Sequence, residues 1–298
     1  NILGRLLTSS VDFNIEIDGT PTGDLELSDD AKLALAMQTE GKYTLKEDMT
    51  LSQPFVVEAG TNFTLNLDGN TISLAKDVYA DENGNAVKEH VIVNNGTLEI
   101  TGGTISSLGV NGGSVIMNNG TLTVTDATLN GAPCDKNVAV GTNNINYPSY
   151  AVNNKGIMTL TNTTITSNHG AVASYAANAV VTLNNSVIDM AGIPGFTSHG
   201  FYTYNGGKVV VNGGTYENKA TDQASSGGSV INGYVEVNAG TFSGRIEAYY
   251  GTPVLKGGIY SVKPTAYIAT GYKALEKNGK YVVVANDIDA ACASQEEL

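Results

Sequence analysis

The fold is decided by the stretch NGTLEITGGTI, residues Asn95–Ile105, because this phrase is repeated along the chain. The next copy, NGTLTVTDATL, is Asn119–Leu129. More divergent copies occupy Phe63–Ile72, Gly156–Ile165, Val181–Ile188, Gly207–Tyr216, Asn232–Phe242 and Gly251–Tyr260. Most neighbouring copies are separated by roughly 22–28 residues, with insertions between some of them, and such a period is typical of a solenoid.

Within each copy, apolar residues alternate with polar ones, which predicts a strand with one buried face. A second short strand is predicted upstream of each copy, as at Val91–Asn94 and Val115–Asn118. Asn-Gly and Gly-Gly-Thr turns separate these strands from each other and from a third one. Three strands and three turns per coil predict an all-β parallel β-helix of about 8–10 coils. The turn asparagines are expected to stack into a ladder, and the glycine after each of them to accept positive φ.

Five segments are expected along the chain. Ser28 precedes two acidic residues and an apolar run, which predicts a short capping helix. Asn278-Gly279 lies between two apolar runs, which predicts a hairpin over the last coil. The segments are an N-terminal extension (1–27), the capping helix (28–40), the parallel β-helix (41–262), the C-terminal cap hairpin (263–286), and a linker or tail that is alternatively the start of a further unit (287–298).

The two longest insertions, Ser73–Glu89 and Asn130–Ser149, follow the third strand of their coils. Long loops of this kind are where binding sites are expected. The threonines at 161, 163, 164 and 166 suggest rows of hydroxyl groups. These rows are expected to lose register from coil to coil.

The net charge of −13 argues against nucleic acid as a partner, since phosphate binding requires clustered Lys and Arg. No apolar run has transmembrane length, so membrane insertion is not expected. The first residue is Asn rather than Met, which suggests a processed product or a fragment. Pairing of Cys134 with Cys292 is left open.

No catalytic residue and no metal site is assigned from the sequence. Arg245 and Glu247 are expected to pair on one face of a strand, and no pair of acids predicts a hydrolase dyad. His169 and His199 precede successive upstream strands, where turn capping is favoured over a metal or acid–base role. Asp81–Asn85 resembles a calcium loop, although an Asn-Gly hairpin tip is favoured; calcium is the one cofactor considered.

Tyrosines are the stronger candidates for a binding site, because most of them lie in the second half of the chain. If they face outward on adjacent coils, they form a flat platform on which sugar rings stack. The alternative is internal aromatic stacking, with Tyr202 and Tyr204 aligned with Val91 and Val93. The ligand-binding candidates are Tyr175, Tyr202, Tyr204, Tyr249 and Tyr250.

The chain resembles the pectate-lyase-like right-handed β-helix repeat proteins of bacterial surfaces over residues 40–262. Lys42–Leu51 and Thr64–Ile72 look like the opening of such domains, and Gly257–Ala274 is similar to their ending. The resemblance implies secreted or surface-attached proteins, some of them adhesins. Similar modules occur in phage virion proteins, and the family also includes polysaccharide lyases and hydrolases.

Together these observations favour a non-enzymatic structural or adhesive module that presents loops and tyrosines to a glycan or a protein on a host or cell surface. The expected location is extracellular, on a cell surface or in a virion. One alternative is a phage fibre or capsid decoration protein, and another is a polysaccharide lyase or glycoside hydrolase. A homo-oligomer or a tandem array is also considered.

Overall fold

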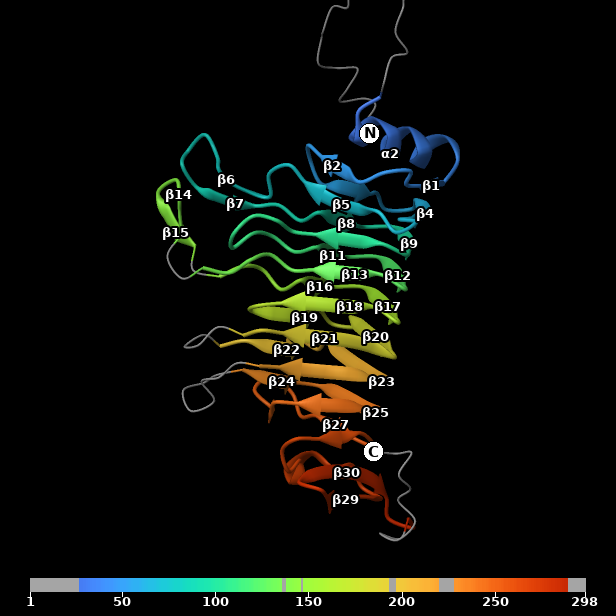
Figure 1. Cartoon of the computed structure of the whole chain (residues 1–298), viewed down its shortest axis with the longest axis vertical. Coiled ribbons are helices and arrows are strands. Elements are labelled where there is room, and N and C mark those ends of the chain that lie inside the picture. Colours follow the sequence, from blue (N-terminus) through green and yellow to red (C-terminus); the bar gives the residue numbers. More distant parts are fainter. Residues whose placement is uncertain (1–26, 136–137, 146, 193–196, 220–227, 289–298) are drawn as a thin grey trace, which may run out of the picture.

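The computed structural model describes residues 27–135, 138–145, 147–192, 197–219 and 228–288. Strands stacked along one long axis make up most of this part of the chain, and each coil places its strands beside those of the previous coil (Figure 1). The fold is therefore an all-β stack of parallel coils, a solenoid. The predicted extension at 1–26, the tail at 289–298 and Cys292 lie outside the described residues.

One sheet of eight parallel strands runs along the stack, in the order β26-β24-β22-β19-β16-β11-β8-β3. We call it the short sheet. Its strands correspond to the predicted upstream strands, and its outer edges are β3 at the N-terminal end and β26 at the C-terminal end. They are β3 (Phe55–Val57), β8 (Ile92–Asn94), β11 (Ile116–Asn118), β16 (Val152–Asn154), β19 (Gly170–Ser174), β22 (His199–Thr203), β24 (Ser229–Asn232) and β26 (Arg245–Glu247).

The other strands of the coils form one eighteen-stranded sheet, which we call the long sheet. In most coils two strands belong to it, joined by the Gly-Gly-Thr turn or its equivalent. The first of each pair are β1 (Lys42–Thr44), β4 (Asn62–Asn66), β9 (Thr97–Thr101), β12 (Thr121–Thr125), β17 (Ile157–Thr161), β20 (Val180–Asn184) and β27 (Val254–Leu255). The second are β2 (Met49–Leu51), β5 (Thr71–Leu74), β10 (Thr104–Ser106), β13 (Thr128–Asn130), β18 (Thr164–Ser167), β21 (Ser186–Met190) and β28 (Ile259–Tyr260). In two coils the pair is continuous, as β23 (Lys208–Asn218) and β25 (Val235–Ser243).

The core follows from the register of these strands. Leu98 lies beside Leu122 on the next coil, and Leu122 lies beside Met158. All three are almost fully buried, while their neighbours in sequence point outward. Because every coil repeats this alternation, buried side chains line up in columns along the interior, which is what the repeated phrase predicts.

The predicted asparagine ladder is confirmed at the ends of the short-sheet strands. The Asn94 side-chain amide donates to Asn118 Oδ1 at 2.7 Å, and the Asn118 amide donates to Asn154 Oδ1 at 2.8 Å. All three side chains are buried. A second ladder, Asn119 to Asn95 at 2.8 Å, runs beside it on the exposed side of the turn. Buried amides with all their hydrogen bonds made hold the coils in one register.

Gly96, Gly120 and Gly156, at the ladder turns, do not have positive φ, so the prediction was wrong there, whereas Gly206 and Gly233, which follow Asn205 and Asn232, do have it. What the ladder-turn glycines require is close approach of the backbone. A Cβ at Gly120 would lie 2.0 Å from the carbonyl oxygen of Gly96, and one at Gly156 would lie 2.0 Å from that of Gly120. The left-handed conformation also occurs at the Gly-Gly turn, where Gly102 and Gly103 have φ of 64° and 69°.

Aromatic rings fill the interior of the last coils. Phe201, Tyr216, Phe242 and Tyr260 form one continuous stack, and each ring centroid lies 5.1 Å from the next. The hydroxyl groups of Tyr216 and Tyr260 donate to the carbonyl oxygens of Gly213 and Gly257. Internal aromatic stacking is therefore present, but it involves residues other than the candidate binding tyrosines.

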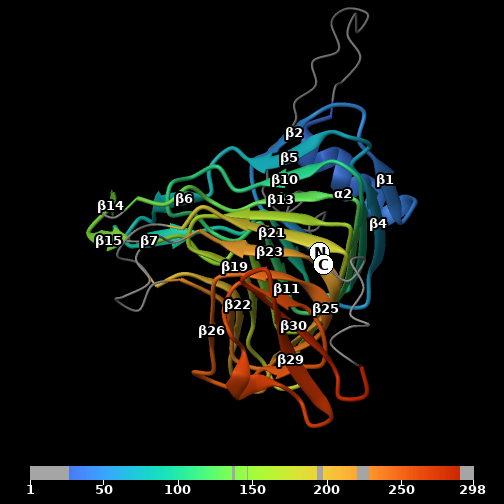
Figure 2. The ribbon, with the colours of Figure 1, turned by 60° about the horizontal axis from the view of Figure 1, so that its bottom comes forward.

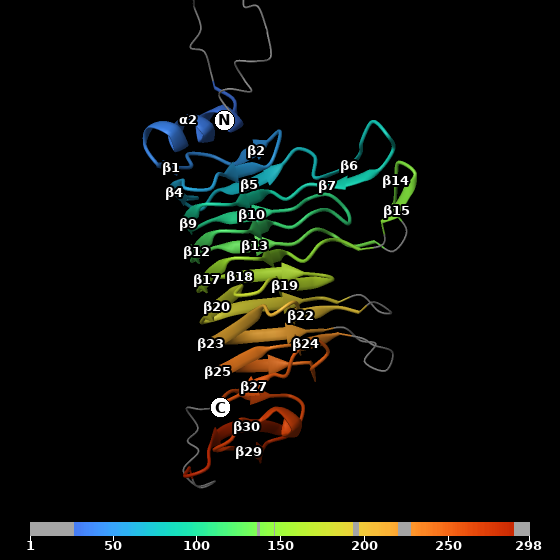
Figure 3. The same ribbon diagram turned by 180° about the vertical axis from the view of Figure 1, so that it is seen from behind.

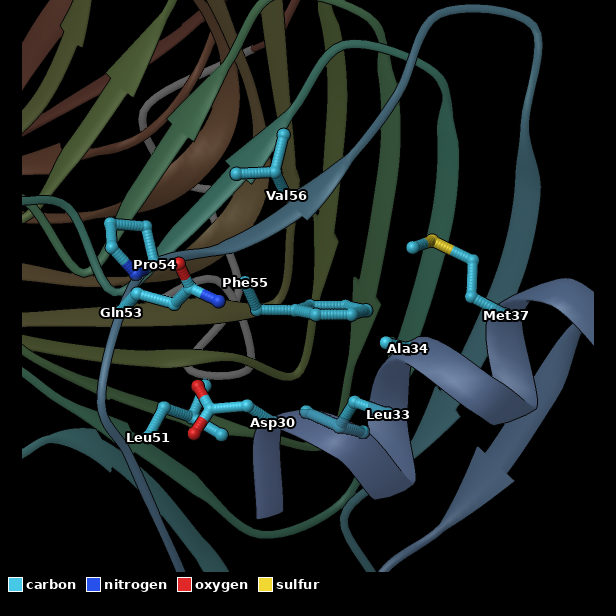
Figure 4. Close-up of a pocket in the computed structure, with 9 residues that line it drawn as sticks. All are labelled: Asp30, Leu33, Ala34, Met37, Leu51, Gln53, Pro54, Phe55 and Val56. Carbon is cyan, nitrogen blue, oxygen red and sulfur yellow. The ribbon is translucent and has the colours of Figure 1, made fainter. Parts of the chain in front are cut away.

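Both ends of the stack are covered. Helix α2 (Asp29–Thr39) begins after Ser28, whose side chain accepts a hydrogen bond from the Ala31 amide, as the sequence predicts. Leu33 and Met37 of α2 lie over Leu51 and Phe55 of the first coil (Figure 4). At the other end, β29 (Tyr272–Lys277) and β30 (Lys280–Ala285) form the predicted hairpin after the short helix η1 (Thr265–Tyr267), and β30 pairs antiparallel with β28.

The insertions project from one side of the stack (Figures 1 and 3). The first forms the hairpin β6 (Val78–Ala80) and β7 (Ala86–Lys88), and the second contains β14 (Val138–Val140) and β15 (Asn143–Ile145). The two hairpins touch, because Thr142 donates to the Gly84 carbonyl through its amide and its hydroxyl group. Asp77 anchors the first insertion by accepting from Ser107 and from two loop amides.

The expectation that the threonine rows lose register was wrong for Thr161 and Thr164 and correct for Thr166, which lies between Asn130 and Asp189. Thr71, Thr104, Thr128 and Thr164 are direct neighbours on successive strands, and so are Thr123, Thr159 and Thr182. The long sheet therefore carries columns of hydroxyl groups on its outer surface.

Within the described part of the chain, no helix is both long enough and apolar enough to cross a membrane.

Candidate ligand-binding groove

A groove of about 710 Å³ lies at the C-terminal edge of the short sheet. Ile246 and Glu247 of β26, the edge strand, line the groove, and so do Ala248, Tyr249 and Tyr250 of the loop that follows. Figure 2 shows β26 among the last coils of the stack. Several coils contribute side chains, because the parallel register brings equivalent positions together. The lining residues are Thr197, His199, Tyr202, Asn232, Ile246, Glu247, Ala248, Tyr249, Tyr250 and Tyr267.

Tyr202, Tyr204, Tyr249 and Tyr250 form one aromatic cluster at this groove. Tyr250 is the central ring: its centroid lies 4.6 Å from that of Tyr249, 4.7 Å from that of Tyr204 and 5.8 Å from that of Tyr202. All three contacts are edge-to-face, with interplanar angles of 85°, 71° and 86° respectively. Tyr249 is 75% exposed and Tyr250 is 47% exposed. The structure thus brings together four of the five candidate tyrosines, although Tyr204 touches Tyr250 without lining the groove.

The expected flat platform is not what these rings form. Perpendicular rings make a corner, and a flat platform would require coplanar rings. Edge-to-face packing is the geometry that the quadrupoles of neighbouring aromatic rings favour. A corner of two partly exposed, nearly perpendicular rings suits a small convex group better than a plane.

Tyr175 lies away from this corner. Its hydroxyl group is 3.4 Å from the sulfur of Met117, and the Lys155 ammonium lies 5.2 Å from its ring centroid. Tyr175 follows β19, whereas the groove is lined by residues of β22, β24 and β26 and of nearby loops. The structure therefore does not place Tyr175 with the other candidates.

The register of Tyr202 also differs from the predicted one. Tyr202 is the neighbour of Ala173, and that column continues through Asn153 and Met117 to Val93, not to Val91. Tyr202 is half-buried and lies in a column of side chains on the outer face of the short sheet, whereas the adjacent Phe201 lies in a column that faces the core. Tyr202 therefore points away from the core. One of its neighbours is His199, with ring centroids 5.5 Å apart and an interplanar angle of 15°.

Charges in the groove are largely compensated. Arg245 forms the expected ion pair with Glu247 on β26. His199 Nδ1 lies 2.6 Å from the Ser229 hydroxyl group, and Asn232 Nδ2 lies 3.3 Å from His199 Nε2. Burial, with smaller contributions from His169 and Arg245, lowers the pKa of His199 to about 4, so the imidazole is neutral at neutral pH. Burial also raises the pKa of Tyr202 to about 12, which keeps its hydroxyl group protonated.

This buried imidazole predicts loss of stability in mild acid. Unfolded His199 takes up a proton near pH 6.5, whereas the folded protein does so only near pH 4, so the unfolded state binds more protons between these values. The neutral His199 imidazole therefore contributes to the free energy of unfolding above pH 6.5, and this contribution is lost as the pH falls toward 4. At about 1.4 kcal/mol per pH unit, we expect a loss of roughly 2 kcal/mol from His199 between pH 6.5 and 5.

The measurement is urea unfolding at pH 7, 6, 5.5 and 5 for the native chain and for His199→Gln. The variant has no imidazole at this position, so its unfolding free energy should fall less over this range, by roughly 2 kcal/mol. Equal slopes for the two proteins would show that His199 titrates normally in the folded state. His169, whose pKa burial also lowers to about 4, remains in both proteins and cancels in the comparison.

A second aromatic cluster lies at the insertions. Tyr147 stacks on His169 with ring centroids 4.9 Å apart, and the Lys88 ammonium lies 5.5 Å from the Tyr147 ring centroid and donates to its carbonyl oxygen. Tyr150 connects this cluster to Tyr202, at 5.6 Å between centroids. His169 and His199 therefore each stack on a tyrosine. Among the residues that the structure describes, no cluster of three His, Cys, Asp or Glu could hold a metal ion.

The calcium-like segment forms a hairpin tip between β6 and β7. Asp81 accepts hydrogen bonds there from the amides of Asn83 and Asn85 and from the Asn85 side chain. These bonds lower the pKa of the Asp81 carboxyl group. The carboxylate is thus used by the turn itself, and calcium binding at this loop stays a prediction.

Sequence reasoning missed Thr197, Asn232 and Tyr267 as groove residues. Asn232 belongs to the same column of strand-end positions as Tyr202, so its place could have been found from the correct register. Tyr267 lies in η1, outside the repeated pattern, so the periodicity of the repeats does not predict its position.

Comparisons of this chain with protein-family models, with curated proteins and with solved structures gave no significant match.

Proposed function

We propose that the chain is a non-enzymatic, extracellular glycan-binding module built on a right-handed parallel β-helix. Parallel strands joined by crossovers are right-handed in nearly all known cases, which supports the handedness. The resemblance of the repeats to bacterial surface β-helix proteins supports the location. The glycan-binding role depends on one observation, the corner of exposed tyrosines around a groove with polar walls.

Tyrosines are suited to sugars because each ring offers an apolar face to C–H groups and a hydroxyl group to sugar hydroxyls. Exposed aromatic side chains gathered in one place also mark binding surfaces in general. In the groove, Tyr249 and Tyr250 expose such faces beside the polar side chains of Thr197 and Glu247. The solenoid acts as a rigid support that presents this groove.

The alternative of a polysaccharide lyase or hydrolase places chemistry in the same groove, where Glu247 and His199 are the titratable groups besides the tyrosines. Glu247 is held by Arg245 and lies 3.9 Å from His199 Nδ1, and burial lowers the pKa of His199 to about 4, so at neutral pH its imidazole is a weak general base and not a general acid. The binding proposal is therefore preferred.

A glycan-array screen of the purified chain tests the proposal, followed by a reducing-end assay with the glycans that bind best. Binding without turnover is the expected result. Release of reducing ends would overturn the non-enzymatic role, and absence of binding to every glycan would overturn glycan recognition. Light scattering on the same sample measures the oligomeric state, for which a trimer would favour the virion-fibre alternative.

A further inference from the structure

We propose that the groove is selective for one sugar unit of an uncharged, soluble glycan, and that it discriminates against polyuronates and against crystalline polysaccharide surfaces. This inference rests on the proposed glycan-binding function and specifies its ligand. Two independent observations carry it: the angles between the tyrosine rings and the charges that line the groove.

The ring angles decide between a single sugar unit and a flat surface. A crystalline polysaccharide presents a plane, and several coplanar rings are needed to contact it at once. Tyr250 is instead nearly perpendicular to Tyr249 and to Tyr202, at 85° and 86°. The face of Tyr250 therefore cannot lie on the same plane as the face of Tyr249 or of Tyr202. A single pyranose ring can instead pack its C–H face on one tyrosine while its rim meets another.

The charges decide between neutral and acidic sugars. The groove is lined by one carboxylate, Glu247, and none of its described lining residues is a Lys or an Arg. The nearby Arg245 guanidinium is already bound to Glu247, and the His199 imidazole is neutral. A uronate carboxylate that entered would lose water without gaining a cationic partner, which is costly. The net charge of −13 adds long-range repulsion of a polyanion.

The available polar groups fit hydroxyl groups. The Asn232 side chain is held within the protein, because its Oδ1 accepts from the Tyr249 amide and its Nδ2 contacts His199. The other polar side chains among the lining residues are those of Thr197, Glu247 and the tyrosines. Hydroxyl groups and a carboxylate bind sugar hydroxyls as donors and acceptors, and none of them neutralises an anion.

Isothermal titration calorimetry tests the proposal with neutral oligosaccharides of glucose, galactose, mannose and N-acetylglucosamine, and with oligogalacturonate and oligoguluronate. Pull-down on crystalline cellulose and chitin completes the panel. We expect saturable binding to at least one neutral oligosaccharide, with an affinity that changes little between 50 and 500 mM NaCl, no binding to the uronates, and no retention on the crystalline polymers.

Tyr250→Ala should weaken this binding at least about tenfold, and Tyr249→Ala should weaken it as well. Tyr147→Ala is the matched control, because Tyr147 is 51% exposed and also stacks on a neighbouring ring but lies outside the groove. Tyr250→Phe retains the ring and separates stacking from loss of the hydroxyl group. Thermal unfolding of each variant verifies that it is folded, and the highly exposed Tyr249 is the position least able to disturb the fold.

The possible outcomes distinguish the selectivity of the groove from the proposed glycan-binding function. Binding to uronates alone, or to crystalline polymer alone, would overturn the selectivity and leave glycan binding standing. Neutral-glycan binding that Tyr249→Ala and Tyr250→Ala leave unchanged would overturn the assignment of the site. Failure of every glycan to bind would overturn both the inference and the proposed function.

Discussion

Gly120→Ala is expected to be a severely damaging substitution in the middle of the stack. The new Cβ would lie 2.0 Å from the Gly96 carbonyl oxygen, which is less than any real contact of this kind. That oxygen cannot move freely, because it accepts the hydrogen bond from the Thr121 amide that joins the two coils, at 2.8 Å. The coils must separate locally, and we expect a loss of about 3–5 kcal/mol in the free energy of unfolding, or failure to fold.

Urea unfolding followed by circular dichroism measures this effect. Gly60→Ala is the control, since a Cβ there meets no atom within 4 Å and the only cost arises from its φ of 82°. That cost should be about 1 kcal/mol. Similar losses for Gly120→Ala and Gly60→Ala would mean that backbone approach between coils does not explain the repeated glycine.

Asn118→Ala is also expected to be strongly destabilising. It removes the middle of the buried ladder, so Asn94 loses an acceptor at 2.7 Å and Asn154 loses a donor at 2.8 Å. The Ile157 carbonyl of the next coil also loses its bond from the Asn118 amide. Buried polar groups left without partners cost about 1–3 kcal/mol each, and we expect a total loss of about 3–4 kcal/mol.

The neighbouring residue provides a matched control. Asn119 also forms a ladder bond, to Asn95 at 2.8 Å, but its side chain is exposed and water replaces the lost partner. Asn119→Ala should therefore cost less than about 1 kcal/mol in the same urea titration. If the two alanine variants lost equal stability, burial of the inner ladder would not be what stabilises it.

The stacked coils, the capping helix and the terminal hairpin could be predicted because each depends on a local pattern. The alternation in Asn95–Ile105 determines which side chains are buried, and Ser28 and Asn278-Gly279 are recognisable cap and turn signals. The role of Gly120 could not be predicted from its own turn. Glycine is required there because the carbonyl oxygen of Gly96, which lies 24 positions earlier on another coil, leaves no room for a Cβ. Rules that consider only neighbouring residues in the sequence cannot detect this contact.

The candidate site was only partly predictable, because its geometry also depends on contacts between residues that are far apart in the sequence. Tyr202, Tyr204, Tyr249 and Tyr250 lie on or just after β22 and β26, which flank β24 in the short sheet, and the repeats in the sequence show that they are near one another. The angles between the rings depend on side-chain packing, which periodicity does not describe. A shift of two residues in the assumed register was enough to align Tyr202 with Val91 rather than Val93.

The hydrogen bonds between coils run along the long axis of the stack, since the strands lie across it. A pulling force applied between the two ends would therefore load these bonds in the direction in which they open. Coils would peel away one after another from an end, each at modest force, instead of resisting together as strands do when they are sheared. The helix α2 and the hairpin β29–β30, which cover the two ends, would then set the force at which such unravelling begins.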